Sequence, residues 1–211
     1  SPDFKNLRWI FTASRPLVEA TAFSPLGNAV REFLMRPLSD VEADSLIANF
    51  DTRIVETFNK ESEEFEEYDD QKKNTPIVVT YEAREYMKGV TGCFPYLLQV
   101  VCTHLYEQTT AYHVPVVSQP LLRYVIRRKV IPELSDYFET QKRFLEGPIL
   151  DKILESLSSD LNPLKNLDND FPEINLIERR KLQMSGVGWT EGQCVVSPLF
   201  LYWLWSSLHS E

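Results

Sequence analysis

The chain has 211 residues, of which 43% are hydrophobic and 25% are charged, as is ordinary for a globular protein with a sizeable core. Its formal net charge is −9, and the charge is distributed unevenly along the chain. Residues 1–117 carry 11 basic and 18 acidic side chains, and residues 118–211 carry 11 basic and 13 acidic side chains. Neither half has the positive field typical of nucleic-acid binding, and no apolar run reaches the roughly 18 residues of a membrane span.

The start of the sequence and the cysteines indicate what kind of chain this is and in which compartment it lies. The start, SPDFKNLRW, has neither an initiating Met nor the regions of a signal peptide, so we expect a piece of a longer protein. Cys93, Cys102 and Cys194 form no metal-ligand pattern, and His104 does not share a helix face with Cys102. An odd number of scattered cysteines is typical of reduced thiols and predicts a cytoplasmic protein.

Two apolar runs open the chain. RWIFTASRP (8–16) predicts a buried strand that ends at Pro16, and FLMRPL (33–38) is a second strand-like run that ends at Pro37. A wholly apolar strand is usually a central member of a parallel sheet, but the flanking sequence predicts no neighbouring strand. We therefore expect the rest of this sheet upstream.

A helix is predicted to follow. Ser39 is a good N-cap, with Glu42 at the capping-box position, and Leu46, Ile47 and Phe50 lie on one face.

The next segment, 51–76, differs in composition. Its part KESEEFEEYDDQKKN is rich in Asp and Glu, which favours a solvated surface insertion. An acidic docking segment is the alternative.

Helices are predicted for most of the remaining chain. TYEAREYMKGV ends at Gly89 or Gly92, and PYLLQVVCTHLYEQ (95–108) follows with a wide apolar surface. Residues 118–144 predict one helix, capped by Ser118 and kinked or broken around Pro132.

The C-terminal part predicts further helices and then two short β segments around Glu191-Gly192. An aromatic helix closes the chain. Its large side chains are expected in the core: Phe200, Tyr202, Trp203 and Trp205.

No catalytic motif is present in the sequence. It contains no HExxH, no GxSxG and no Cys/His/Asn grouping, and the phosphate-binding motif GxxxxGK[ST] is also missing. The chain alone is therefore not expected to catalyse a reaction or to hold a triphosphate.

Four short sequence motifs occur in this order along the chain: FTASR (11–15), SPLGN (24–28), FLMRPLSDVEADSLI (33–47) and TGCFPYLLQ (91–99). They are followed by an ending compatible with a winged helix. Together they resemble the second half of signal-transduction ATPases with numerous domains (STAND) and of the related archaeal-type P-loop ATPases, within the AAA+ group. The resemblance implies a mainly α fold with minor β structure. Residues 1–38 would be a stranded remnant of an α/β ATPase core, residues 39–117 a helical lid with the acidic insertion 51–76, and residues 118–211 a linking helix and a winged-helix domain.

The resemblance also implies site residues. Thr12, Ser14 and Arg15 would end the sensor-1 strand, where an Arg fork suits the charge of a terminal phosphate. Gly92 and Pro95 would form a turn near the adenine. The simpler alternatives are a surface Arg after a strand and a plain helix boundary.

A function follows from the same resemblance. ATP or ADP with Mg²⁺ would bind only together with an upstream P-loop ATPase core, in cis or as a separate chain, because Walker A and Walker B are missing here. The lid and the winged helix would then regulate binding of an unidentified protein partner. Cys93 departs from the family, which usually has a second Gly at this position.

Two other functions stay open. A winged-helix nucleic-acid binder would use Arg179, Arg180 and Lys181, although consecutive residues point around a helix and Glu173 and Glu178 flank them. A protein-interaction domain without any nucleotide role is the second alternative.

Overall fold

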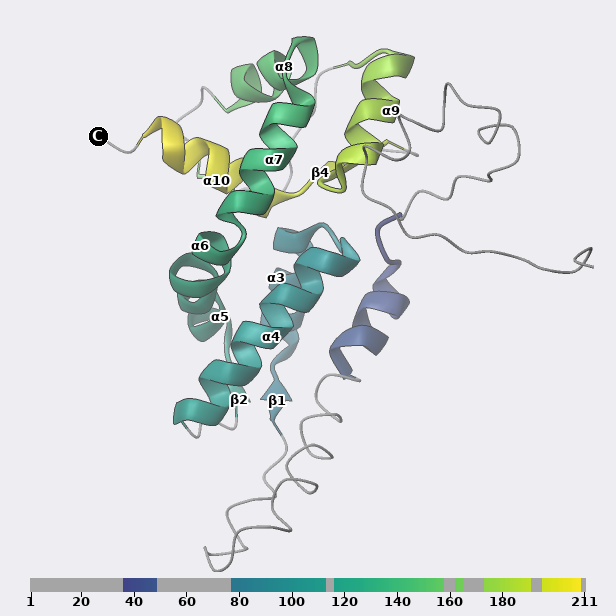
Figure 1. Ribbon diagram of the computed structural model, residues 1–211. Helices are drawn as coiled ribbons and strands as arrows, with labels where there is room; N and C mark the ends of the chain where they lie inside the picture. The colour runs from purple at the N-terminus through teal and green to yellow at the C-terminus, as the bar shows by residue number, and fades with distance from the viewer. Residues whose placement is uncertain are drawn as a thin grey trace, which may run out of the picture. The chain divides into compact units, whose positions relative to one another are not determined.

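The computed structural model describes residues 36–48, 77–112, 116–157, 162–164, 173–190 and 195–209 (Figure 1). Within these ranges the chain is mainly helical with little strand, as predicted, and its strands form two very short pairs. No helix in these ranges combines the length and the apolar character needed to cross a bilayer.

Several predicted features lie outside the described residues. They are the strand at 8–16 with Thr12, Ser14 and Arg15, the phrase SPLGN, Phe50, the acidic segment 51–76, the Glu191-Gly192 turn and Cys194.

The first described helix covers residues 40–48, and its start confirms the predicted capping box. The backbone N–H and hydroxyl of Ser39 each donate to Glu42 Oε2 at 2.8 Å, and the Glu42 N–H donates to Ser39 Oγ at 3.4 Å. The strand expected over 33–38 is wrong for its described part, 36–38, which is irregular. There the Leu38 N–H is bonded to a carbonyl in a helix–helix turn, not to a neighbouring strand.

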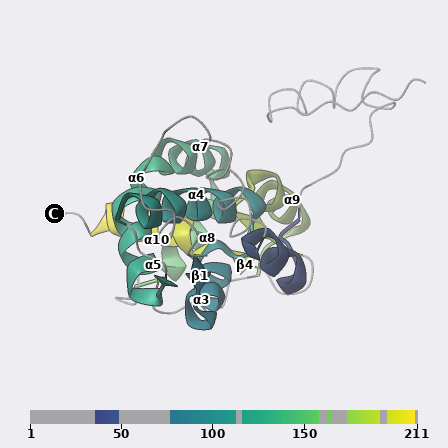
Figure 2. The same cartoon turned by 90° about the horizontal axis from the view of Figure 1, so that it is seen from below.

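Helices α3 (Tyr81–Thr91) and α4 (Pro95–Tyr112) form an antiparallel pair at the predicted positions. Thr80 caps α3 by accepting a hydrogen bond from the Ala83 N–H at 3.3 Å. Figures 1 and 2 show helix 40–48 (purple) beside this pair.

A parallel strand pair, β1 (Val78–Val79) with β2 (Val116–Val117), brings the start of α3 next to the start of α5. The sequence does not predict these strands, because each has only two residues and the two lie far apart along the chain.

The region predicted as one interrupted helix is divided into four pieces: α5 (Gln119–Val125), the π-helical segment η4 (Ile126–Val130), α6 (Ile131–Glu133) and α7 (Ser135–Leu145). The break at Leu134 confirms the predicted interruption near Pro132. Ser118 occupies the N-cap position of α5, but its side chain makes no capping bond, so only its position is confirmed.

The C-terminal elements are α8 (Pro148–Ser156), α9 (Leu176–Ser185), β3 (Gly188–Trp189), β4 (Val195–Val196) and α10 (Pro198–Leu208). The two strands pair antiparallel, which confirms the two predicted β segments. A complete capping box between Asn175 and Glu178 starts α9.

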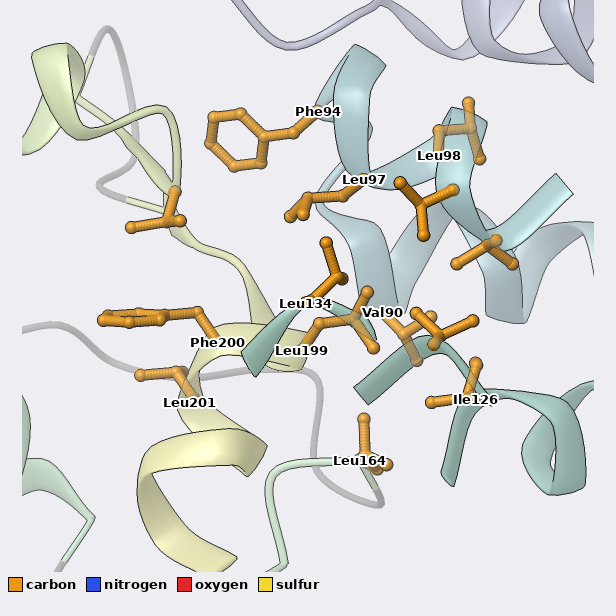
Figure 3. Packing of buried hydrophobic residues seen from close by; sticks show 14 of the residues in the cluster. Val90, Phe94, Leu97, Leu98, Ile126, Leu134, Leu164, Leu199, Phe200 and Leu201 are labelled. Atoms are coloured by element: carbon orange, nitrogen blue, oxygen red, sulfur yellow. The ribbon is translucent and has the colours of Figure 1, made fainter. Parts of the chain in front are cut away.

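One hydrophobic cluster joins α3, α4, α7 and α10, and the labelled side chains in Figure 3 converge on it. Phe138 on α7 and Phe200 on α10 are fully buried, with ring centroids 5.5 Å apart. The predicted core role of the C-terminal aromatic residues is confirmed, because Tyr202, Trp203 and Trp205 also pack against this cluster.

The close packing of β3 against α9 requires a glycine at position 188, and this leads to a first prediction. A Cβ built on Gly188 lies 2.4 Å from Cγ and Cδ1 of Leu182. We therefore expect Gly188→Ala to lower the free energy of unfolding by about 1–3 kcal/mol, the usual cost of overpacking, as measured by urea denaturation. The double variant Gly188→Ala/Leu182→Ala should lose less than the sum of the single losses, since truncating Leu182 removes the clash. Additive losses would contradict this explanation.

Candidate functional site

The turn between α3 and α4 contains both described site residues, Gly92 and Pro95. Gly92 and Cys93 adopt successive left-handed conformations, with φ of 61° and 55°. Their N–H groups close α3 by donating to the carbonyls of Gly89 and Lys88, each at 3.2 Å. Glycine adopts this conformation freely, whereas a side chain makes it costly, so the backbone at Cys93 is strained.

Side chains on both sides fix this turn. The Thr91 hydroxyl donates to the Met87 carbonyl at 2.8 Å and accepts from the Cys93 N–H at 3.3 Å. Phe94 is buried, and half-buried Pro95 begins α4, where a missing N–H costs nothing. The helix-boundary interpretation of Gly92 and Pro95 is thus confirmed, and their role near an adenine stays a prediction.

The segment before helix 40–48 lies against this turn. The Leu38 N–H donates to the Cys93 carbonyl at 2.9 Å, so the PLS phrase (37–39) contacts the TGCFP phrase (91–95). Two motifs that are far apart in the sequence therefore form one structural unit.

Lys88 holds helix 40–48 against α3. Its side chain is only 8% exposed, and Nζ lies 2.6 Å from Glu85 Oε1, 3.4 Å from Asp44 Oδ1 and 3.8 Å from Asp40 Oδ1. The hydrogen bond to Glu85, followed by the charges of the other carboxylates, raises the pKa of Lys88 although burial acts in the opposite direction. Lys88 therefore stays charged and links two helices that are distant in the sequence.

The other cation near the turn, Arg36, is also paired. Its Nη2 lies 3.0 Å from Glu42 Oε1, and its Nη1 donates to the Pro37 carbonyl at 3.1 Å. Hydrogen bonds from Ser39, with a further contribution from Arg36, hold the pKa of Glu42 below its ordinary value. Arg36 and Lys88 therefore both have carboxylate partners.

The cysteine thiols do not add reactive chemistry to the site. Burial, together with the negative charge of Asp40, raises the pKa of the Cys93 thiol to about 11, so the nucleophilic thiolate is scarce. Cys102 is buried, with Sγ 3.8 Å from Met87 Sδ. No group of three or more metal-ligating side chains occurs in the part of the chain that the structure describes.

The candidate nucleic-acid residues on α9 are not aligned as one binding surface. Arg179 Nε donates to the Ile174 carbonyl at 3.2 Å, and Lys181 Nζ donates to the Glu146 carbonyl at 2.8 Å. Lys181 also lies over the ring of Phe144, 5.7 Å from its centroid. Two of the three cations thus bind their own chain, on different sides of α9.

Lys88 is not among the residues singled out from the sequence. Its spacing from Glu85 is typical of a pair on one helix face, and this was the available signal. Asp40 and Asp44 belong to a separate helix, so their contribution required the tertiary structure.

Comparisons with protein-family models, with curated proteins and with solved structures found no match. The resemblance to P-loop ATPases therefore rests on the sequence phrases and remains a prediction.

The tight packing at Gly92 gives a second prediction. A Cβ built there lies 3.2 Å from Phe94 Cε2 and 3.8 Å from Ser197 Cα. We expect Gly92→Ala to reduce the free energy of unfolding by about 1–2 kcal/mol, the cost of a left-handed alanine, in urea titrations. Gly92→Asn adds the same Cβ, but Asn tolerates left-handed backbone, so its loss should be smaller. Equal losses for both variants would show that the contacts, and not the backbone conformation, require glycine.

A third prediction concerns Lys88. Lys88→Met keeps the length of the side chain and removes its charge, and should cost about 1–2 kcal/mol at neutral pH, because the carboxylates are partly exposed and the pair is not fully buried. The exposed Lys129→Met is the control and should change stability by less than about 0.5 kcal/mol.

The stability difference between the wild type and Lys88→Met should also depend on pH. The raised pKa means that folded Lys88 holds its proton more tightly than unfolded Lys88. Its stabilisation is therefore complete below the unfolded value of 10.5 and is lost as pH rises through the folded value. Urea unfolding at neutral and strongly alkaline pH should show the difference between wild type and Lys88→Met shrinking only at alkaline pH. A difference that does not change with pH would argue against the charge.

Proposed function

We propose that this chain is the lid and winged-helix portion of a signalling P-loop ATPase of the AAA+/STAND kind. In this proposal it couples the ATP or ADP state of an upstream core to the binding of a protein partner. The chain itself supplies no catalytic residue, and the nucleotide with Mg²⁺ binds where the core meets the lid. The cytoplasm, where ATP is available and thiols stay reduced, is the location that fits this function.

The observation that carries the proposal is the contact between the PLS and TGCFP phrases. In the ATPases that the chain resembles, the PLS phrase lies at the junction of the core and the lid, and the TGCFP phrase belongs to the lid. Here the Leu38–Cys93 backbone bond joins them, and the ion pairs of Lys88 hold together the two helices beside them. Chance similarity of two short phrases would not lead us to expect their contact in the fold.

The order of the C-terminal elements gives further support. Helices α7, α8 and α9 are followed by the antiparallel pair β3–β4 and then by α10. Three helices followed by a β-hairpin is the order expected of a winged helix.

Contacts from the turn toward α9 suggest how the two parts could be coupled. Tyr96, next to Pro95, lies 5.0 Å from Tyr137 on α7, measured between ring centroids. The Tyr137 hydroxyl donates to the Gly186 carbonyl, just after α9, at 3.3 Å. A nucleotide can shift these helices only through a difference in its affinity for two arrangements, and a displaced turn would supply such a difference.

A protein-interaction domain without a nucleotide role is the second candidate, and one observation favours it. Leu176 and Ile177, at the start of α9, are each 81% exposed. Nucleic-acid binding has less support, because Arg179 and Lys181 bind carbonyl groups of their own chain.

A fourth prediction tests the nucleotide role. The protein is first isolated from its native cells at its natural length, established by immunoblot, and its affinity for a fluorescent ATP analogue is measured. We expect Pro95→Ala to weaken this affinity about three- to tenfold, or by up to about 1.4 kcal/mol, because it loosens the turn against the nucleotide.

The matched control is Pro148→Ala. Pro148 also begins a helix, α8, shortly after a glycine with positive φ, Gly147, but it is exposed. It should leave the affinity unchanged. No ATP binding by the natural-length protein, or equal losses in both variants, would count against the ATPase proposal and favour the interaction domain.

A further inference from the structure

A compact basic surface lies on α5 and η4, away from the α3–α4 turn. Its four cations occur between residues 123 and 129, which corresponds to roughly 9 Å of helix axis at about 1.5 Å per residue. All four are exposed: Arg123, Arg127, Arg128 and Lys129. We call these four residues the basic patch. It stands out in a chain whose net charge is −9.

The basic patch has no carboxylate partner within the described ranges. None of its members forms an ion pair with a described Asp or Glu, in contrast to Arg36, Lys88, Arg143 and Lys152. The next acidic residue along the chain, Glu133, has its Oε2 2.6 Å from His104 Nε2. Within the described residues, the positive charge of the patch is therefore not neutralised by an ion pair.

An aromatic ring orients part of the patch. The Arg123 guanidinium carbon lies 4.8 Å from the centroid of the Tyr86 ring. Burial raises the pKa of Tyr86, while the charges of Arg123 and Arg127 act in the opposite direction. A guanidinium that is already oriented loses less side-chain entropy when it binds a ligand.

Three of the four cations lie on the π-helical segment η4. The Ile131 N–H donates to the Ile126 carbonyl, five residues back, just before Pro132, which has no N–H to donate. Arg123 precedes Arg127 by four residues, a spacing that places side chains on the same side of a helix. Segments of π-helix are rare and are frequent at functional sites.

We propose that the basic patch binds a short acidic peptide segment of a partner protein. Three of its four cations are arginines, whose planar forks match carboxylates in two-point hydrogen bonds. The patch covers about two helical turns, and the chain as a whole has a net charge of −9. This net charge disfavours a long polyanion such as a nucleic acid more than a short acidic segment that spans only the patch.

This proposal does not depend on the nucleotide role. The test uses the whole chain without nucleotide and measures fluorescence anisotropy of a labelled poly-glutamate decapeptide at low and at physiological salt. Arg127→Glu/Arg128→Glu should weaken binding at least tenfold. The matched control is Arg179→Glu/Arg180→Glu, another exposed adjacent Arg pair with the same change in charge, and it should change the affinity less than twofold.

Circular dichroism tests whether each variant is folded. If Arg127→Glu/Arg128→Glu is unfolded, Arg127→Gln/Arg128→Gln is used in its place. Binding that falls equally in both Arg-pair variants would overturn the proposal, because it would reflect the overall charge. Lack of decapeptide binding would overturn it as well. Tighter binding of an oligothymidylate of the same length would assign the surface to nucleic acid instead.

Discussion

The left-handed turn at Gly92 and Cys93 is the constraint on which the described fold depends. It ends α3, sets the start of α4, and offers the Cys93 carbonyl to Leu38. The start of α10 also packs there, because Ser197 Cα lies within van der Waals distance of a Cβ built on Gly92. Helix 40–48, the α3–α4 pair and the C-terminal helix are therefore positioned by one short stretch of backbone, which explains why glycine is needed there.

Charge complements this backbone constraint. Lys88 pairs with carboxylates from α3 and from helix 40–48. Lys152 pairs with Glu178 at the start of α9, with Lys152 Nζ 2.9 Å from Glu178 Oε2. In both places a cation that is mostly shielded from water joins the start of one helix to the body of another. The basic patch differs, because its charges serve no such link among the described residues, and this difference is what marks it as a surface for another molecule.

The sequence predicted the features whose causes are local. The Ser39–Glu42 capping box, the end of α3 at Gly92 and the interruption near Pro132 depend on side chains within one helical turn, so residue type and spacing were sufficient. The β1–β2 pair and the clustering around Lys88 were not predicted, because their partners lie far apart along the chain and only the tertiary fold brings them together. At the candidate site, the helix boundary at Gly92 and Pro95 was predicted, but its contact with Leu38 was not.

The contact between α10 and α3 has a consequence for how the chain acquires its structure. The hydroxyl of buried Ser197 donates to the Val90 carbonyl at 3.4 Å, a bond between residues separated by 107 positions. Contacts of such large sequence separation slow folding, since a long loop must close before they form. During synthesis, the part of α3 that packs against α10 therefore stays uncovered by it until α10 has left the ribosome, and in that time it is accessible to chaperones and to other nascent chains.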